Sequence, residues 1–157
     1  MEPVDIFNLK GGLLHRHRPA SGFPGLVAAD LFGLDLRCAE LSGANLEGVH
    51  LDTAILDEAR LKEADLYWAG LSMTSLRGAD LEGASLRGAS CQEADFSKAN
   101  LNRTDFGRDN LGGATQLQGA ILAHATVIGA IFDGAMYDKL TVFPDGFDPL
   151  KAGMVLA

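Results

Sequence analysis

The stretch LRGADLEGASLRGASCQEADFSKANL, residues 76–101, repeats one pattern every five positions. Followed in both directions, the pattern defines seventeen centres from Leu31 to Leu111, of which fourteen are Leu and the others are Cys91, Phe96 and Phe106. Ala stands two positions before twelve of these centres, and the residue between is usually small and polar or charged. The chain is therefore dominated by an internal five-residue repeat.

A period of five excludes both regular alternatives for this region. A helix would spread leucines spaced by five around its whole circumference, and a long strand would send them alternately to opposite faces. The pattern fits a short extended piece followed by a corner, with Ala and Leu pointing inward and the residue between them pointing out. Glycines such as Gly48 and Gly83 recur at the corners, where tight turns often need a positive φ. Such units bury their apolar side only by stacking, so the sequence predicts an all-β solenoid.

Blocks such as Ala44-Asn45-Leu46-Glu47-Gly48 and Ala79-Asp80-Leu81-Glu82-Gly83 resemble those of the pentapeptide repeat family. The resemblance extends over roughly residues 29–137. It implies a right-handed quadrilateral parallel β-helix, with four pentapeptides in each coil and a narrow interior of Leu, Phe and Ala.

The register breaks once. After Leu111 the next centres are Leu117, Leu122, Val127, Phe132 and Tyr137, so one step is six residues long. We expect a one-residue bulge near residues 112–115, where two glycines stand. With it, the repeat amounts to twenty-two units, or about five and a half coils over residues 26–137.

The two ends are expected to act as caps, because unpaired solenoid edges promote aggregation. Residues 1–25 lack the repeat and are expected to cover the first coil, at least in part. In residues 138–157, Phe143 and Phe147 flank a turn signal and are expected to plug the last coil. The tail from Ala152 to Leu156 is apolar enough either to finish this cap or to join two copies as a homodimer.

Composition limits the functions to consider. The 157 residues carry a net charge of −8, which disfavours direct nucleic-acid binding, since phosphate contacts need clustered Lys and Arg. No run is long enough for a membrane span and residues 1–25 do not form a secretory signal, so we expect no membrane association and a cytoplasmic location. Two cysteines, Cys38 and Cys91, are expected to stay unpaired in a reducing compartment.

Neither an enzyme nor a cofactor or metal site is expected. His15 and His17 would lie on one side of a strand and could offer two imidazoles to a metal, but a solvated basic segment of the cap is the favoured interpretation. Cys91 is a repeat centre and should be a buried, inert thiol. A narrow interior filled by Leu and Ala leaves no concave pocket for a substrate.

Two outward features are candidates for contact with a protein partner. The face predicted to be centred on Leu31, Leu51, Leu71, Cys91, Leu111 and Phe132 presents Asp30, Asp52, Glu93 and Asp133 and no Lys or Arg. These carboxylates either solubilise the rod or dock a basic partner. Tyr67 and Trp68 form an adjacent aromatic pair, which either covers the glycine corners Gly48 and Gly88 or anchors an interface.

Two functions follow as hypotheses. The first is a non-catalytic scaffold that binds another protein through its outer faces. The second is implied by the resemblance: some pentapeptide repeat proteins mimic DNA, bind bacterial DNA gyrase or topoisomerase IV, and protect it from inhibitors such as quinolones. The acidic rod agrees with mimicry in sign, but its charge density is below that of B-DNA, which carries one charge per ~1.7 Å.

Overall fold

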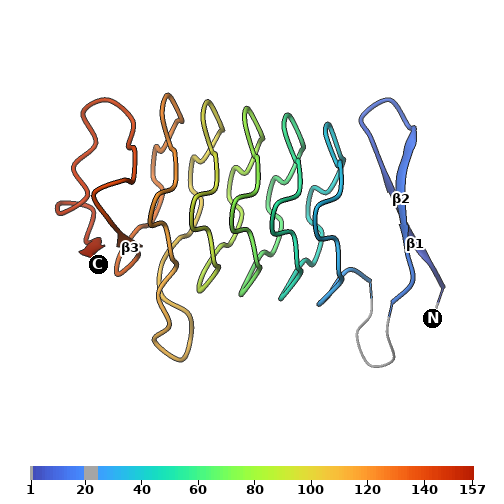
Figure 1. Cartoon of the computed structure of the whole chain (residues 1–157), viewed down its shortest axis with the longest axis horizontal. Coiled ribbons are helices and arrows are strands. Elements are labelled where there is room, and N and C mark those ends of the chain that lie inside the picture. The colour runs from blue at the N-terminus through green and yellow to red at the C-terminus, as the bar shows by residue number, and fades with distance from the viewer. Residues whose placement is uncertain (1, 20–24) are drawn as a thin grey trace.

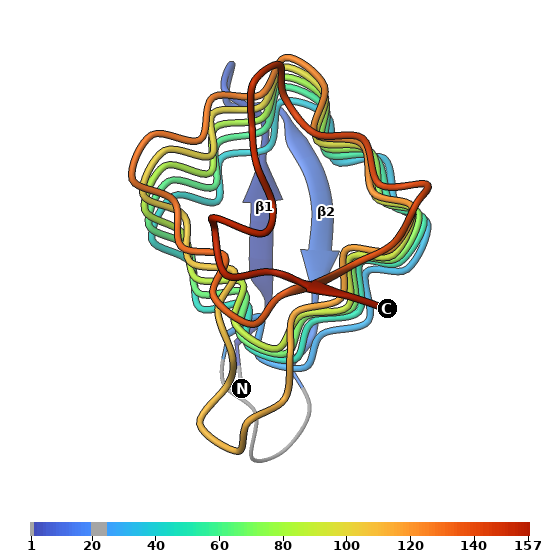
Figure 2. The same cartoon turned by 90° about the vertical axis from the view of Figure 1, so that its left-hand side faces the viewer.

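Each five-residue unit forms one side of a four-sided coil (Figure 2). In the unit around Leu66, the side chains of Ala64 and Leu66 are 1% and 0% exposed, whereas Asp65 between them is exposed. A corner follows each centre and is closed by a backbone hydrogen bond. The N–H of the residue three positions after the centre donates to the carbonyl of the centre, for example from Ala54 to Leu51 at 2.9 Å. The folded coil therefore has the predicted alternation of inward apolar and outward polar side chains.

Coils stack as parallel ladders with an offset of twenty residues (Figure 1). Asp30 pairs with His50, and His50 pairs with Gly70, while the N–H of Leu31 donates to the carbonyl of His50 at 2.9 Å. This computed structural model describes residues 2–19 and 25–157, and within these ranges it contains no helix. The repeat is thus an all-β stack of coils around an apolar interior.

The four sides of the coils are named here by their inward-pointing centres. Face 1 has Leu31, Leu51, Leu71, Cys91 and Leu117; face 2 has Leu36, Leu56, Leu76, Phe96 and Leu122; face 3 has Leu41, Leu61, Leu81, Leu101 and Val127; face 4 has Leu26, Leu46, Leu66, Leu86, Phe106 and Phe132.

The interior tolerates a polar group only where the group is bonded. Thr74, Thr104 and Thr115 replace Ala at interior positions and are all buried. Their hydroxyls donate to carbonyls of the preceding coil, for example from Thr104 to Leu81 at 2.8 Å. Burying a hydroxyl is costly unless it is hydrogen-bonded, and here that condition is met.

The predicted one-residue bulge is wrong. Ser90 pairs with Gln116, 26 positions later, where the earlier rungs pair 20 apart, so six additional residues are accommodated in this coil. The additional residues lie within a loop of residues 107–114 that leaves the rod (Figure 1), and Leu111 is not a core centre but is 81% exposed. The physical reason is Asp109, which would occupy the interior position before Leu111 and would bury a carboxylate there.

The beginning of the chain forms an antiparallel hairpin of β1 (Val4–Phe7) and β2 (Leu13–His17). The hairpin lies across one end of the rod (Figure 2), and Ile6 is 2% exposed in the common core. It is joined to the first coils by the N–H of Glu40, which donates to the carbonyl of Phe7 at 2.9 Å. Of the segment 1–25 expected to cover this end, positions 1 and 20–24 lie outside the described residues.

The other end is closed by the last twenty residues. Phe147 packs edge-on against Phe132, with ring centroids 5.1 Å apart, and Phe143 stacks on Phe147 at the same distance. After a turn, β4 (Val155–Leu156) pairs in parallel with β3 (Met136–Tyr137) as the final rung. Phe143 and Phe147 therefore lie over the last coil.

Both cysteines are free thiols, and complete burial raises the pKa of the Cys91 thiol far above its ordinary range. Cys91 is therefore protonated and unreactive at neutral pH. In the described ranges, no helix has the length and apolar character that a membrane crossing requires.

Candidate protein-binding surface

The six additional residues change which acidic side chains share a face. Asp30, Asp52 and Glu93 lie on face 1, as expected, but Phe132 stacks on Phe106 and not on the face-1 column. Asp133 consequently belongs to face 4, and the predicted single face with four carboxylates does not form. The predicted face requires Leu111 to be a centre, and Leu111 lies in the loop instead.

Two of the face-1 carboxylates also serve the backbone. Asp52 accepts a bond from the N–H of Ser72 at 2.9 Å, one coil away, and Asp30 accepts one from the N–H of Phe32 at 3.3 Å. Side-chain bonds of this kind hold turns in place. Asp30 and Asp52 thus have a structural role whether or not they bind a partner.

Tyr67 and Trp68 lie at a corner of face 4, where they hold the loop of residues 107–114. The indole Nε1–H of Trp68 donates to Asp109 Oδ2 at 2.6 Å, and the Tyr67 hydroxyl accepts the N–H of Asn110 at 3.2 Å. The indole also covers Gly88, because a Cβ at that glycine would lie 2.6 Å from Cδ1 of the ring. The expected packing over Gly88 is present, but a Cβ at Gly48 would meet no atom within 4 Å, so the indole does not cover that corner. The sequence spacing does not indicate the contact with the loop about forty residues later.

Asp109 organises the loop from inside. Its Oδ1 accepts the N–H groups of Leu111 at 2.8 Å and Gly113 at 2.6 Å, while Oδ2 accepts the Trp68 indole. The bond from Trp68, followed by the backbone bonds, lowers the pKa of Asp109 below its ordinary value. The loop is therefore held most firmly while Asp109 is ionised, and this support is lost as the pH falls through the lowered pKa.

Arg87 adds a third attachment. Its Nε donates to the carbonyl of Arg108 at 2.7 Å, and its Nη2 donates to the side chain of Asn110 at 3.3 Å. Three consecutive loop residues, 108 to 110, are thus bonded to side chains of face 4. These bonds leave Leu111 projecting from a loop that is fixed at its base.

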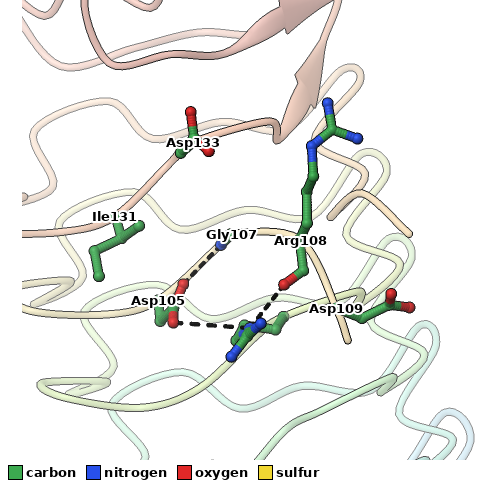
Figure 3. Close-up of a pocket in the computed structure, with 7 residues that line it drawn as sticks. Asp105, Gly107, Arg108, Asp109, Ile131 and Asp133 are labelled. Atoms are coloured by element: carbon green, nitrogen blue, oxygen red, sulfur yellow. Dashed lines mark hydrogen bonds and ion pairs between the residues drawn. The ribbon is translucent and has the colours of Figure 1, made fainter. Parts of the chain in front are cut away.

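Beside the loop, face 4 has an open hollow of about 250 Å³ (Figure 3). Asp133 and Ile131 border it from the later coil, and Ile131 is 50% exposed. The complete lining is Arg87, Asp105, Gly107, Arg108, Asp109, Ile131 and Asp133. The structure therefore brings Tyr67, Trp68 and Asp133 to one side of the rod, around a loop that the sequence did not reveal.

This surface combines apolar and charged side chains. Exposed apolar groups (Leu111, Ile131 and the half-exposed indole of Trp68) alternate with carboxylates and guanidinium groups. Among residues 2–19 and 25–157, no three His, Cys, Asp or Glu side chains cluster as metal ligands would. We call the surface formed by Tyr67, Trp68, Asp133 and the loop of residues 107–114 the loop surface.

Comparison with known proteins agrees with the repeat. A family model described as pentapeptide repeats matches residues 27–72 and 74–108 in eight copies, and it ends inside the loop. No curated protein sequence matches the chain.

Two solved structures with similarity are described as pentapeptide repeat proteins. Rfr23 from the cyanobacterium Cyanothece 51142 is 31% identical, with a TM-score of 0.44 over 68% of this chain and 65% of that one. HetL from the cyanobacterium Nostoc sp. strain PCC 7120, described as involved in heterocyst differentiation regulation, is 30% identical, with a TM-score of 0.48 over 82% and 57%. The chain thus spans less than two thirds of the length of either protein.

QnrB1, described as a plasmid-mediated fluoroquinolone resistance protein, is 19% identical, with a TM-score of 0.32 over 75% of this chain and 77% of that one. The family model covers more than half of the chain, and its eight copies coincide with the stacked coils, so the chain belongs to the pentapeptide repeat family.

Proposed function

We propose that this protein is a non-catalytic scaffold that binds another protein, and that the loop surface is its main contact. The observation that carries the proposal is Leu111, a large apolar side chain that is 81% exposed on a loop with fixed attachments. An anchor residue that is already held in place loses little conformational entropy when it enters a partner's pocket. Tyr67 and Trp68, whose residue types are enriched among interface hot spots, bond the two loop residues that precede it.

The test replaces Leu111 and leaves the residues that attach the loop unchanged. Wild type, Leu111→Ser and Ile128→Ser would each be immobilised and exposed to lysate, and captured proteins would be identified by mass spectrometry. Ile128 is a matched control, since it is 77% exposed on face 3. We expect a protein that wild type and Ile128→Ser retain and that Leu111→Ser loses by at least tenfold, as hot-spot truncation does. Equal capture by all three would contradict the role of the loop surface.

A second candidate is the DNA-mimicking binder of gyrase or topoisomerase IV that protects it from quinolones. It is favoured by the absence of Lys and Arg from face 1 between Asp30 and Gln118. The corrected register makes this face sparser than expected. Asp30, Asp52 and Glu93 lie over three ladder steps, or about 14 Å, where B-DNA would present about eight charges.

The gyrase candidate predicts a loss of inhibition when face 1 is neutralised. We would change Asp30→Asn, Asp52→Asn and Glu93→Gln together, and Asp133→Asn separately because it lies on face 4. The amides keep a hydrogen-bond acceptor for the backbone, so folding should be unaffected. Inhibition of gyrase supercoiling would be measured for each variant at two salt concentrations.

If face 1 imitates DNA, wild type inhibits gyrase, the triple variant does not, and added salt weakens the inhibition. Loss only in Asp133→Asn would move the contact to the loop surface. No inhibition by wild type at micromolar concentration would reject the gyrase candidate and leave the scaffold proposal to its own test.

A further inference from the structure

The N-terminal hairpin presents apolar side chains on the side that faces away from the rod. Ile6 and Leu14 pack towards the core, whereas Phe7 and Leu13, which are paired across the two strands, are 44% and 52% exposed. Leu9, at the turn between the strands, is 41% exposed. A solenoid cap that faces only water is expected to be polar on the outside. This cap instead carries exposed apolar side chains.

The opposite end of the rod is apolar as well. Leu150, Val155 and Leu156 are 71%, 42% and 52% exposed. Among the described residues, β4 pairs with β3 on one side and has no strand on the other. An exposed apolar edge strand is a surface that another chain readily covers.

The charges of the two ends are complementary. Residues 2–19 carry three cations (Lys10, Arg16 and Arg18) against two carboxylates (Glu2 and Asp5), a net charge of +1, and Asp5 is paired with Arg16 at 2.6 Å. Residues 138–157 carry three carboxylates against two lysines, so this end has the opposite sign. Two copies of the same end repel each other, whereas unlike ends attract.

From these observations we propose that the protein associates head to tail, with the N-terminal hairpin of one copy seated on the C-terminal cap of the next. The contact is heterologous, so it repeats along the axis and extends the rod rather than closing a dimer. Phe7 and Leu13 of one copy cover the apolar edge around Leu150 and Leu156 of its neighbour. This association is independent of the partner-binding function proposed above.

The experiment blocks one end at a time. Phe7→Ser/Leu13→Ser blocks the hairpin end and Leu150→Ser/Leu156→Ser blocks the cap end, while Ile128→Ser on face 3 is the control. All five side chains are at least 44% exposed, so the coils should fold as in wild type, which far-ultraviolet circular dichroism checks. Weight-average mass would be measured by sedimentation over a hundredfold range of concentration.

We expect the mass of wild type and of Ile128→Ser to rise with concentration beyond twice the 16.6 kDa of one chain. Each end-blocked variant alone should stay at the mass of one chain. Their equimolar mixture should double in mass and stop there, because it contains one open hairpin end and one open cap end per pair.

Other outcomes would overturn the proposal. If wild type stays monomeric over the whole concentration range, the proposed association is rejected. A dimer that persists when the hairpin end is blocked means cap-to-cap contact, and one that persists when the cap end is blocked means hairpin-to-hairpin contact. If a double variant does not fold, Leu13→Ser and Leu156→Ser replace it singly, with the same expected pattern of complementation.

Discussion

Leu66→Lys is expected to abolish folding. Leu66 is fully buried at the centre of face 4, between Leu46 and Leu86 of the neighbouring coils. A lysine there would place an ammonium group among apolar side chains with no carboxylate in reach, at a cost of at least several kcal/mol. The whole stability of a domain is about 5–15 kcal/mol, so most of it would be lost.

The matched control for this substitution is Leu66→Met, which keeps the volume and should cost less than about 1.5 kcal/mol. Both variants would be compared with wild type by urea unfolding, followed by circular dichroism. Leu66→Lys with a cooperative transition near that of Leu66→Met would contradict the packed interior described here.

Phe106→Ala is expected to have the second largest effect, a loss of about 3–5 kcal/mol in the free energy of unfolding. The Phe106 ring is fully buried and stacks on Phe132, with centroids 4.9 Å apart and planes 5° apart. It also meets Phe96 edge-on at 5.9 Å. Because Phe132 in turn contacts Phe147, the substitution weakens the connection between the coils and the C-terminal cap.

Phe32→Ala serves as the control, since Phe32 is 62% exposed and its loss should change stability by no more than about 0.5 kcal/mol. The unfolding midpoint in urea would be measured for both. A similar change in the two variants would mean that the aromatic column does not contribute to stability as its burial indicates.

The coils could be predicted from the sequence because each unit repeats the same physical requirement. In every unit the Leu must be buried and the polar residue before it must face water. These two requirements determine which side chains point into the coil. Leu31 and Leu101 obey this requirement equally, although seventy positions separate them.

The loop of residues 107–114 could not be predicted from spacing. Leu111 lies five positions after Phe106 and six before Leu117, so a one-residue bulge satisfies the count as well as a loop does. The signal that separates the two is Asp109, since a carboxylate at an interior position is incompatible with a coil.

The loop surface can be predicted from the sequence only in part, for the same reason. Tyr67 and Trp68 were recognisable as an unusual exposed pair, but their partners Asp109 and Asn110 are about forty positions away and reach them only because the loop folds back. A one-residue bulge would put Asp133 on face 1, whereas the six additional residues put it on face 4. The apolar outer side of the hairpin depends on which residues of a non-repeating segment face the core, and no periodicity indicates that.

The contact between Trp68 and Asp109 has a consequence for spectroscopy. Trp68 is the sole tryptophan of the chain, and its indole lies on the outside of the rod against the loop. Its emission therefore reports the surroundings of the loop and not the packing of the interior. Emission and circular dichroism should coincide during unfolding only if the loop and the coils melt as one cooperative unit.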